Sequence, residues 1–229
     1  MTGADLQKGR EQKGWTQEQS ALKLGISQPY ISLLEKGTRR VPEKLARKAA
    51  TLFGLSAVKL PIETVGHRVQ PKNDQALSSD LAALGYPGLS YLKSRRKRNP
   101  AEVMLSALMN ENLDARLAEA LPWVLVKHPD LDWEWLVRAA KVNDLQNKLG
   151  FVTNVARRLA EKLDKLETVS LLREKESLLE KSRLAREDTL CHDSLTQSER
   201  RWLQLNRSDE AKHWNLLTDL SLEHLSHVS

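Results

Sequence analysis

Apolar residues in the first 60 positions recur every three or four residues, in short runs that glycines separate. This spacing predicts four short helices, the first over residues 4–13. Thr16 and Gln19 have the spacing of a capping box, which predicts that the second helix begins there and that Gly25 ends it. The predicted buried side of that helix consists of Ala21, Leu22 and Leu24.

Ser27 is predicted to cap a third helix whose Ile31 and Leu34 point inward, and Pro42 is predicted to open a fourth helix that ends at Gly54. The third helix then turns four residues outward: Gln28, Pro29, Ser32 and Leu33. An exposed basic loop is expected to separate the third helix from the fourth. Two helices joined by a short turn and followed by such a loop have the layout of a helix-turn-helix DNA-binding element.

The rest of the chain has no strand-like alternation after a proline-containing linker over residues 61–79. We expect one helix from Asp132 to Leu149, broken at Gly150, and an amphipathic helix from Phe151 that extends into one long rod. A last helix is expected around Trp214. The predicted fold class is therefore all-α: a bundle of about five helices over residues 1–60, the linker over 61–79, and a larger all-helical domain over 80–229 with a sub-boundary near 188–195.

Charge divides the chain along the same boundaries. Residues 1–60 carry eleven Lys and Arg against five Asp and Glu, residues 61–99 seven against three, and residues 100–229 eighteen against twenty-two, which together give the net charge of +6. A basic front end suits a polyanion, because phosphate contacts release counterions. The single cysteine excludes an internal disulfide, and no apolar run is long enough to cross a bilayer, so we expect a cytoplasmic, nucleoid-associated protein.

The first quarter of the chain resembles the XRE-type helix-turn-helix domain of the phage repressor and Cro family. The resemblance rests on Leu6, Arg10, Thr16-Gln17, Ala21, Leu24-Gly25-Ile26-Ser27, Tyr30-Ile31-Ser32, Leu34-Glu35-Lys36-Gly37 and Pro42. One departure is Ser20, where the family usually has an apolar residue. The resemblance implies that the third helix enters the major groove of DNA and that dimers bind two half-sites about one helical turn apart.

The resemblance also implies which residues contact DNA. Gln28 would pair with an adenine, Leu33 would pack on a thymine methyl, and Pro29 and Ser32 share this outward face. Phosphate contacts are expected from Gln17, Tyr30, Lys36, Thr38, Arg39 and Arg40. A second basic run, Arg95, Arg96, Lys97 and Arg98, is interpreted either as a solvated turn or as further contacts to phosphates or to an acidic partner.

Tryptophans gather at Trp123, Trp133 and Trp135, where they would form either a helical core, which we favour, or a ligand cage. The segment from Gly85 to Leu149 is similar to antitoxin-like proteins that are paired with nucleotidyltransferase-type toxins. We therefore expect an autoregulatory repressor that binds a palindromic operator as a dimer and serves as an antitoxin. The alternative is a ligand-responsive repressor whose Trp-rich helical domain binds a small molecule.

No phosphate-binding glycine loop, HExxH or GxSxG motif occurs in the sequence. Cys191, His192 and Asp193 adjoin, but sequence neighbours do not easily converge on one reacting atom, so a loop is the better interpretation. His224 and His227 lie one helical turn apart without an evident third ligand, so a metal site is not expected. The chain is therefore expected to be neither an enzyme nor a cofactor-binding protein.

Overall fold

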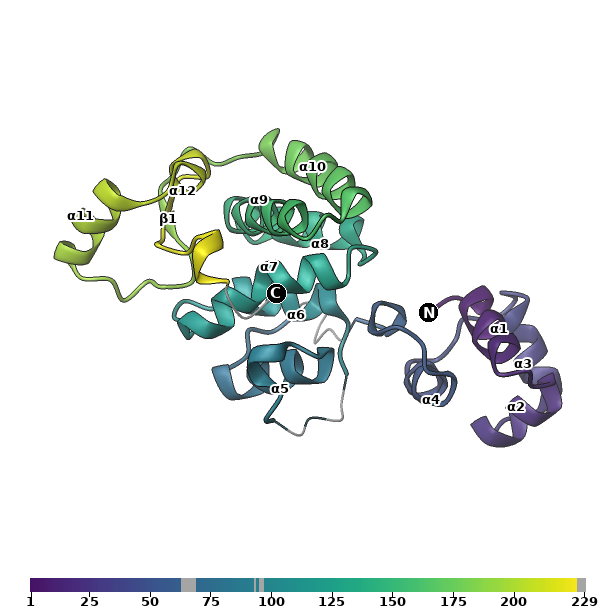
Figure 1. Ribbon diagram of the computed structural model, residues 1–229. Coiled ribbons are helices and arrows are strands. Elements are labelled where there is room, and N and C mark those ends of the chain that lie inside the picture. The colour runs from purple at the N-terminus through teal and green to yellow at the C-terminus, as the bar shows by residue number, and fades with distance from the viewer. Residues whose placement is uncertain (63–68, 93, 95–96, 226–229) are drawn as a thin grey trace. The chain divides into compact units, whose positions relative to one another are not determined.

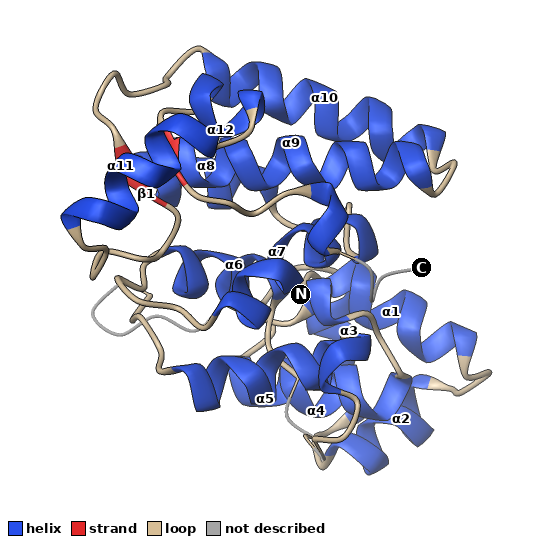
Figure 2. Cartoon of the chain, turned by 60° about the vertical axis from the view of Figure 1, so that its left-hand side comes forward, coloured by secondary structure: helices blue, strands red, loops and turns tan. Residues whose placement is uncertain are grey.

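The fold is described from a computed structural model that covers residues 1–62, 69–92, 94 and 97–225, without the side chain of His224. The chain divides into two compact units, Met1–Glu63 (unit 1) and Thr64–Ser229 (unit 2). Both are built mainly from helices, as Figure 2 shows, which confirms the predicted helical class. The described residues also include two strands of two residues each, so the expectation that every element is helical was wrong in this detail.

Unit 1 contains four α-helices and one 3-10 turn. Their bounds are α1 Gly3–Gln12, α2 Gln17–Leu24, α3 Gln28–Glu35, α4 Glu43–Phe53 and η1 Ala57–Lys59. The predicted capping box is present, since the Thr16 hydroxyl accepts from the backbone of Gln19 and the Gln19 side chain accepts from that of Thr16. Gly25 adopts the left-handed conformation that ends α2.

The core of unit 1 is a single cluster on which all four helices converge. Its buried members are Leu6, Ala21, Leu24, Ile31, Leu34, Leu45, Ala49 and Phe53. Two local predictions are corrected here. Leu22 is 82% exposed, because it lies on the face of α2 opposite Ala21 and Leu24. Ser27 precedes α3 with extended backbone but its side chain makes no capping hydrogen bond, so only the backbone geometry of the predicted cap is present.

Unit 2 contains the other eight α-helices of the described residues (Figure 1). Their bounds are α5 Asp74–Leu84, α6 Pro100–Leu108, α7 Ala115–Lys127, α8 Trp133–Val142, α9 Gln146–Lys162, α10 Leu166–Glu180, α11 Gln197–Asn206 and α12 Asp209–His213. Short 3-10 turns occur at η2 Pro87–Leu89 and η3 Leu222–His224. α5 begins within residues 61–79 because Asn73 caps it, so those residues are not linker throughout.

The predicted helix from Asp132 to Leu149 is two helices. α8 ends before Asp144, whose positive φ of 57° turns the chain, and α9 then begins at Gln146. Gly150 lies inside α9 and does not break it. The ring of Trp214 occupies the place of the missing side chain, since a Cβ on Gly150 would come within 2.2 Å of that ring. This glycine therefore marks a close contact inside a helix and not a helix end.

The predicted long rod from Phe151 is also divided. Asp164 has a positive φ of 54°, and α9 and α10 fold back on each other on either side of it. The apolar face of the predicted amphipathic helix therefore packs within the chain. Beyond α10, strands β1 (Asp188–Thr189) and β2 (Leu216–Leu217) pair in parallel. The expected last helix around Trp214 is replaced by α12, β2 and η3, and Trp214, which directly follows α12, is fully buried.

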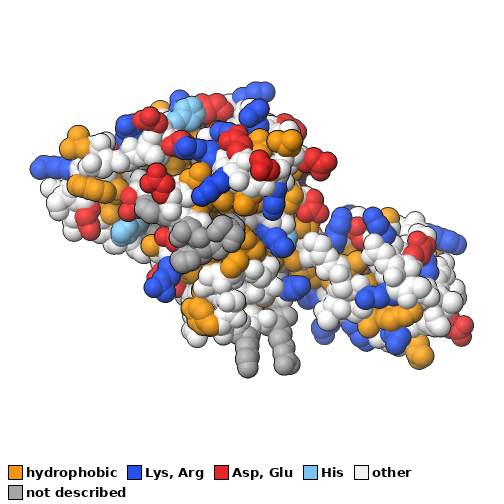
Figure 3. Space-filling view, in the orientation of Figure 1, with side chains coloured by type: hydrophobic (Ala, Val, Ile, Leu, Met, Phe, Trp, Pro, Cys, Tyr) orange, Lys and Arg blue, Asp and Glu red, His pale blue; other side chains and the backbone are white. Residues whose placement is uncertain are grey.

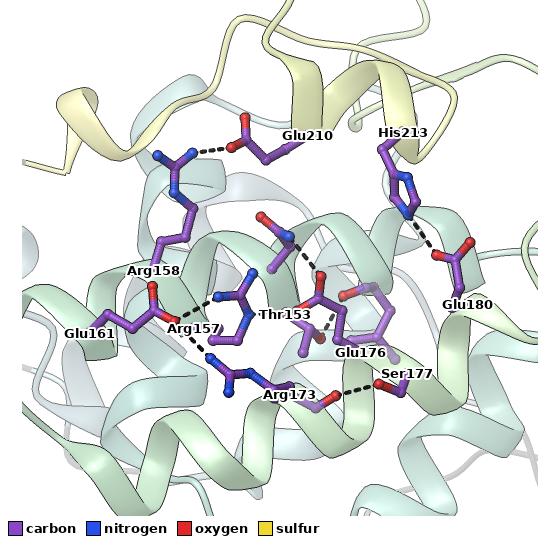
Figure 4. Close-up of polar contacts among 12 residues, drawn as sticks. Thr153, Arg157, Arg158, Glu161, Arg173, Glu176, Ser177, Glu180, Glu210 and His213 are labelled. Atoms are coloured by element: carbon purple, nitrogen blue, oxygen red, sulfur yellow. Dashed lines mark hydrogen bonds and ion pairs between the residues drawn. The ribbon is translucent and has the colours of Figure 1, made fainter.

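Polar contacts hold α12 over the pair formed by α9 and α10 (Figure 4). Arg158 on α9 pairs with Glu210 on α12, and the Nε2 atom of His213 on α12 lies 2.7 Å from the Glu180 carboxylate on α10. Below them, Arg157 donates to Glu176 from Nε at 2.7 Å. These polar contacts, together with the buried ring of Trp214, attach the chain after residue 180 to the helical core.

Candidate nucleic-acid interface

A hydrogen-bonded network in unit 1 connects the core to the outward end of α3. Arg10 on α1 and Glu35 at the end of α3 form a bidentate ion pair, with Nε–Oε1 and Nη2–Oε2 distances of 2.7 and 3.0 Å. The side-chain amide of Gln17 donates to the Glu35 carboxylate at 2.9 Å, and the side-chain amide of Gln28 donates to the side-chain oxygen of Gln17 at 2.9 Å. Gln17 therefore joins the start of α2 to both ends of α3, to Gln28 at its start and to buried Glu35 at its end.

Hydrogen bonding to Glu35 raises the pKa of Arg10 above its usual value, against the opposing effect of burial. Arg10 also donates to the backbone oxygen of Trp15 at 2.9 Å. Arg10 and Glu35 both belong to the sequence motif, but their pairing was not predicted because 25 positions separate them. Only their opposite charges and their places in the motif pointed to a contact.

The predicted base-contacting residues share the outward face of α3. Gln28 and Pro29 are exposed in its first turn, Leu33 is 37% exposed and Ser32 is half-buried. Ile31 and Leu34 point in the opposite direction and are fully buried. Helical spacing therefore separates the residues that fix α3 to the unit from those that remain available to a ligand.

The predicted phosphate-contacting residues flank this face on two sides. Gln17 and Tyr30 are half-buried, whereas Lys36, Thr38, Arg39 and Arg40 are exposed on the loop after α3. Gly37 in this loop has a φ of 71°, a left-handed conformation that suits glycine. No ion pair to a described residue neutralises Lys36, Arg39 or Arg40, so their charges are available to an anion.

The second basic run lies in unit 2, and its described residues differ in exposure. Arg95 and Arg96 lie outside the described residues, and Lys97 is exposed. Arg98 is buried in unit 2, where it pairs with Asp80 at 3.1 Å and with Glu102 on α6. The expectation that Arg98 contacts DNA or a partner was therefore wrong, because its charge is already matched by two carboxylates inside the unit.

The tryptophans do not form a cage in unit 2. Trp123 and Trp133 are buried; the ring of Trp123 meets that of Tyr86 edge-on at 5.3 Å, and the Trp133 Nε1 atom donates to the Pro129 oxygen at 2.9 Å. The third of these residues, Trp135, is half-buried and lines a surface hollow of about 610 Å³. Other residues that line this hollow are Val69, Leu105, Met109, Arg138 and Val142. Two of the three rings thus belong to the core.

The adjacent Cys191, His192 and Asp193 do not converge in the way a catalytic triad would. Cys191 is buried against the backbone oxygen of Ala107, 3.5 Å from its Sγ atom, and burial raises the pKa of its thiol to about 12. A thiol with that pKa is protonated at neutral pH and is a poor nucleophile. His192 is exposed, while the Asp193 carboxylate accepts from the hydroxyl of Thr189.

The described residues contain neither a group of metal ligands nor a helix that could span a membrane. Among the described residues, no three His, Cys, Asp or Glu side chains are grouped closely enough to hold a metal ion. His227 and the side chain of His224 lie outside the described residues. No helix in the described part of the chain has the length and apolar character that a bilayer crossing requires.

Residues 6–60 match the family model for the helix-turn-helix. Unit 1 contains a helix-turn-helix DNA-binding domain. The match confirms the XRE-type resemblance over this segment, about a quarter of the chain, and indicates a transcription regulator. Comparison with curated proteins and with solved structures gives no match.

Within this helix-turn-helix domain, α2 and α3 are the two helices of the motif. The domain places Gln28 at the end of α3 that approaches base edges in this type of reader. The network through Gln17 and Glu35 therefore lies between the hydrophobic core and the predicted DNA-contacting end of α3.

Proposed function

We propose that this protein is a sequence-specific transcriptional repressor that binds a palindromic operator as a homodimer and regulates its own gene. The observation that carries the proposal is the exposed face of α3, which begins at the Gln28 amide and leads into a basic loop whose Lys36, Arg39 and Arg40 form no ion pair among the described residues. A glutamine amide can pair with the N6 and N7 atoms of adenine, and the loop cations can contact the phosphates around it. α3 itself has one amide and no arginine, so pairing of two copies would supply much of the specificity.

We propose further that the regulator is the antitoxin of a toxin-antitoxin pair and acts by binding, not by catalysis. The support is the similarity of residues 85–149 to antitoxin-like proteins and the mildly acidic balance of residues 100–229, which suits a protein partner better than DNA. DNA binding favours a cytoplasmic, nucleoid-associated location for such a protein.

The experiment for the repressor is footprinting of the full chain on the DNA upstream of its own gene. Two protected half-sites about one helical turn apart are expected. Protection that random DNA removes as effectively as the upstream DNA would contradict sequence-specific binding.

The antitoxin proposal has a separate genetic test. The open reading frame beside this gene is expressed alone and with the full chain. Growth arrest by the neighbour and relief by this protein would support the proposal, whereas a harmless neighbour that forms no complex would exclude it. A matched control carries Arg39→Ala and Arg40→Ala, which should abolish repression and preserve the relief of toxicity.

A second candidate is a repressor that releases DNA when a small molecule binds in unit 2. The hollow of about 610 Å³ beside Trp135 favours it, since that volume is typical of sites for small ligands. Trp135→Ala should then yield a repressor that binds its operator normally and no longer responds to the inducing compound.

A further inference from the structure

Helix α11 (Gln197–Asn206) carries apolar side chains that are exposed and not packed in the core of unit 2. Leu203 points inward and is buried, whereas Trp202 is 56% exposed and Leu205 is 82% exposed. Trp202 and Leu205 are three residues apart and so lie on one side of the helix. Figure 3 shows apolar side chains at the surface over α11, at the left edge of the view. An exposed tryptophan with an apolar neighbour is a common feature of protein interaction sites.

Two surface hollows adjoin α11. The first, of about 470 Å³, has an apolar lining that includes Leu113, Leu190, Leu203, Leu217 and Leu220. The second, of about 510 Å³, is lined by Trp202 together with Val155, Leu220 and Leu222. Asp219 and Leu220 line both hollows, so the two are neighbours, and we call the pair of adjacent hollows the α11 groove.

The rim of the α11 groove is acidic. Four carboxylates line it: Glu119, Glu210, Asp219 and Glu223. Its lining includes one arginine, Arg158, which is already paired with Glu210, and one histidine, His192. Within the described part of the chain, Glu119, Asp219 and Glu223 form no ion pair. The groove therefore combines apolar and polar walls with three carboxylates that form no ion pair to any described residue.

We propose that the α11 groove is the docking site for a basic, amphipathic helical segment of a partner protein. Apolar side chains of such a segment would fill the two hollows against Trp202, and its Lys or Arg residues would meet the unpaired carboxylates. Opposite charges on the two surfaces accelerate association and select against wrong partners. The identity of the partner as the toxin encoded by the neighbouring gene rests on the proposed antitoxin function.

A second copy of this chain fits the groove less well. Two copies related by a two-fold axis would place the same patch on both sides, so that acidic rim would face acidic rim. DNA is disfavoured for the same electrostatic reason, because its phosphates would meet Asp219 and Glu223. The acidic charge of the groove therefore favours a cationic protein segment over both a second copy of this chain and DNA.

The direct test measures binding between the full chain and the purified product of the neighbouring gene by titration calorimetry. Trp202→Ala should weaken binding at least thirtyfold, because truncation of a central tryptophan in an interface has effects of that size. Asp219→Asn with Glu223→Gln should weaken it about fivefold and reduce its salt dependence. The control is Leu166→Ala on α10, which truncates an exposed apolar side chain, 77% accessible, that does not line the groove. It should leave the affinity for the partner unchanged.

Failure of the groove and failure of the antitoxin function have different signatures. If the neighbour binds and the Trp202 and carboxylate variants bind equally well, the docking site is wrong and the antitoxin function stands. If the neighbour does not bind, the groove is tested with a fluorescent Leu/Lys amphipathic helix and its Leu/Glu counterpart. Binding of the Leu/Lys peptide alone, lost in Trp202→Ala, supports the groove. Equal binding of both peptides, or binding of neither, overturns it.

Two further measurements exclude the other occupants. Trp202→Ala should leave operator binding unchanged, and it should leave the molar mass in solution unchanged. A variant that becomes monomeric where the natural chain is dimeric would show that the groove joins two copies, which overturns the proposal. Because Trp202 is exposed, the variant should retain its circular dichroism; the paired carboxylate variant provides an independent test if it does not.

Discussion

The two units use buried charge in opposite ways. In unit 1, the Arg10–Glu35 pair is continued by Gln17 to Gln28, which lies on the surface that we propose contacts DNA. In unit 2, Arg98, Glu102 and Asp80 form a buried network, to which half-buried Lys72 adds a contact with Asp80 at 3.3 Å. The first network thus leads from the core to the surface that we propose contacts DNA, whereas the second is enclosed around Arg98.

The comparison indicates where each unit should be sensitive. Substitutions at the surface end of the unit 1 network should change DNA binding and barely change the free energy of unfolding. Substitutions within the enclosed network of unit 2 should lower the free energy of unfolding and leave the contacts to DNA unchanged, because buried charges that lose a partner are strongly destabilising.

The largest effect is expected from Arg98→Ala. It leaves two buried carboxylates, Asp80 and Glu102, without the arginine between them, and should lower the free energy of unfolding by about 3–5 kcal/mol. The matched control is Arg138→Ala, which breaks another pair of Arg and Glu four residues apart, Arg138 with Glu134, that is exposed. The control should cost less than about 0.5 kcal/mol in urea-induced unfolding. Equal effects of the two variants would contradict the comparison.

Gly150→Ala should have the next largest effect on stability. Alanine normally favours a helix by about 1 kcal/mol over glycine, but here the added Cβ would collide with the ring of Trp214. We expect a net loss of about 2 kcal/mol from overpacking, measured by thermal unfolding. Trp214→Leu in the same chain should reduce the penalty of the alanine; additive losses in the double variant would show that the two residues do not contact each other.

Gln28→Ala tests the surface end of the unit 1 network. It should weaken binding by about 1–3 kcal/mol at one base pair of the operator, with the midpoint of thermal unfolding unchanged. Gln12→Ala, which removes an exposed amide at the end of α1, serves as the control. If specific and random DNA lose affinity equally, the Gln28 side chain does not recognise a base.

Arg39→Ala should have the smallest and least selective effect. Loss of one phosphate contact should weaken binding to every DNA sequence and reduce the slope of affinity against salt concentration by about one. Arg138→Ala removes the same charge from unit 2 and should leave the slope as it is. A salt slope that Arg39→Ala does not change would remove this residue from the interface.

Unit 1 was largely predictable from the sequence because its determinants are local. Thr16 and Gln19 are three residues apart, Gly25 directly follows the last residue of α2, and the inward residues Ile31 and Leu34 fall within one turn. Each of these features acts within a few positions, which is the range over which helical spacing and capping are informative. The exposure of Leu22 shows the limit, since a short helix carries an apolar residue on its outer face as well.

Unit 2 was less predictable because its determinants are distant in sequence. Gly150 looked like a helix end until the contact with Trp214, 64 positions later, was known. Arg98 looked like part of an exposed basic run until Asp80 was found beside it. Asn147 exchanges hydrogen bonds with the backbone of Leu184 across 37 positions, and nothing near either residue predicts it. Helical periodicity predicted that helices exist there and could not predict how they are joined.

The contact between Gly150 and Trp214 also bears on the order in which the chain acquires structure during synthesis. Unit 1 is complete within its first 63 residues and can fold while the ribosome is still elongating the chain. α9 must wait for the ring of Trp214, so unit 2 cannot reach its final packing until residue 214 has emerged. A nascent chain should therefore acquire its DNA-binding domain well before the unit that we propose contacts a protein partner.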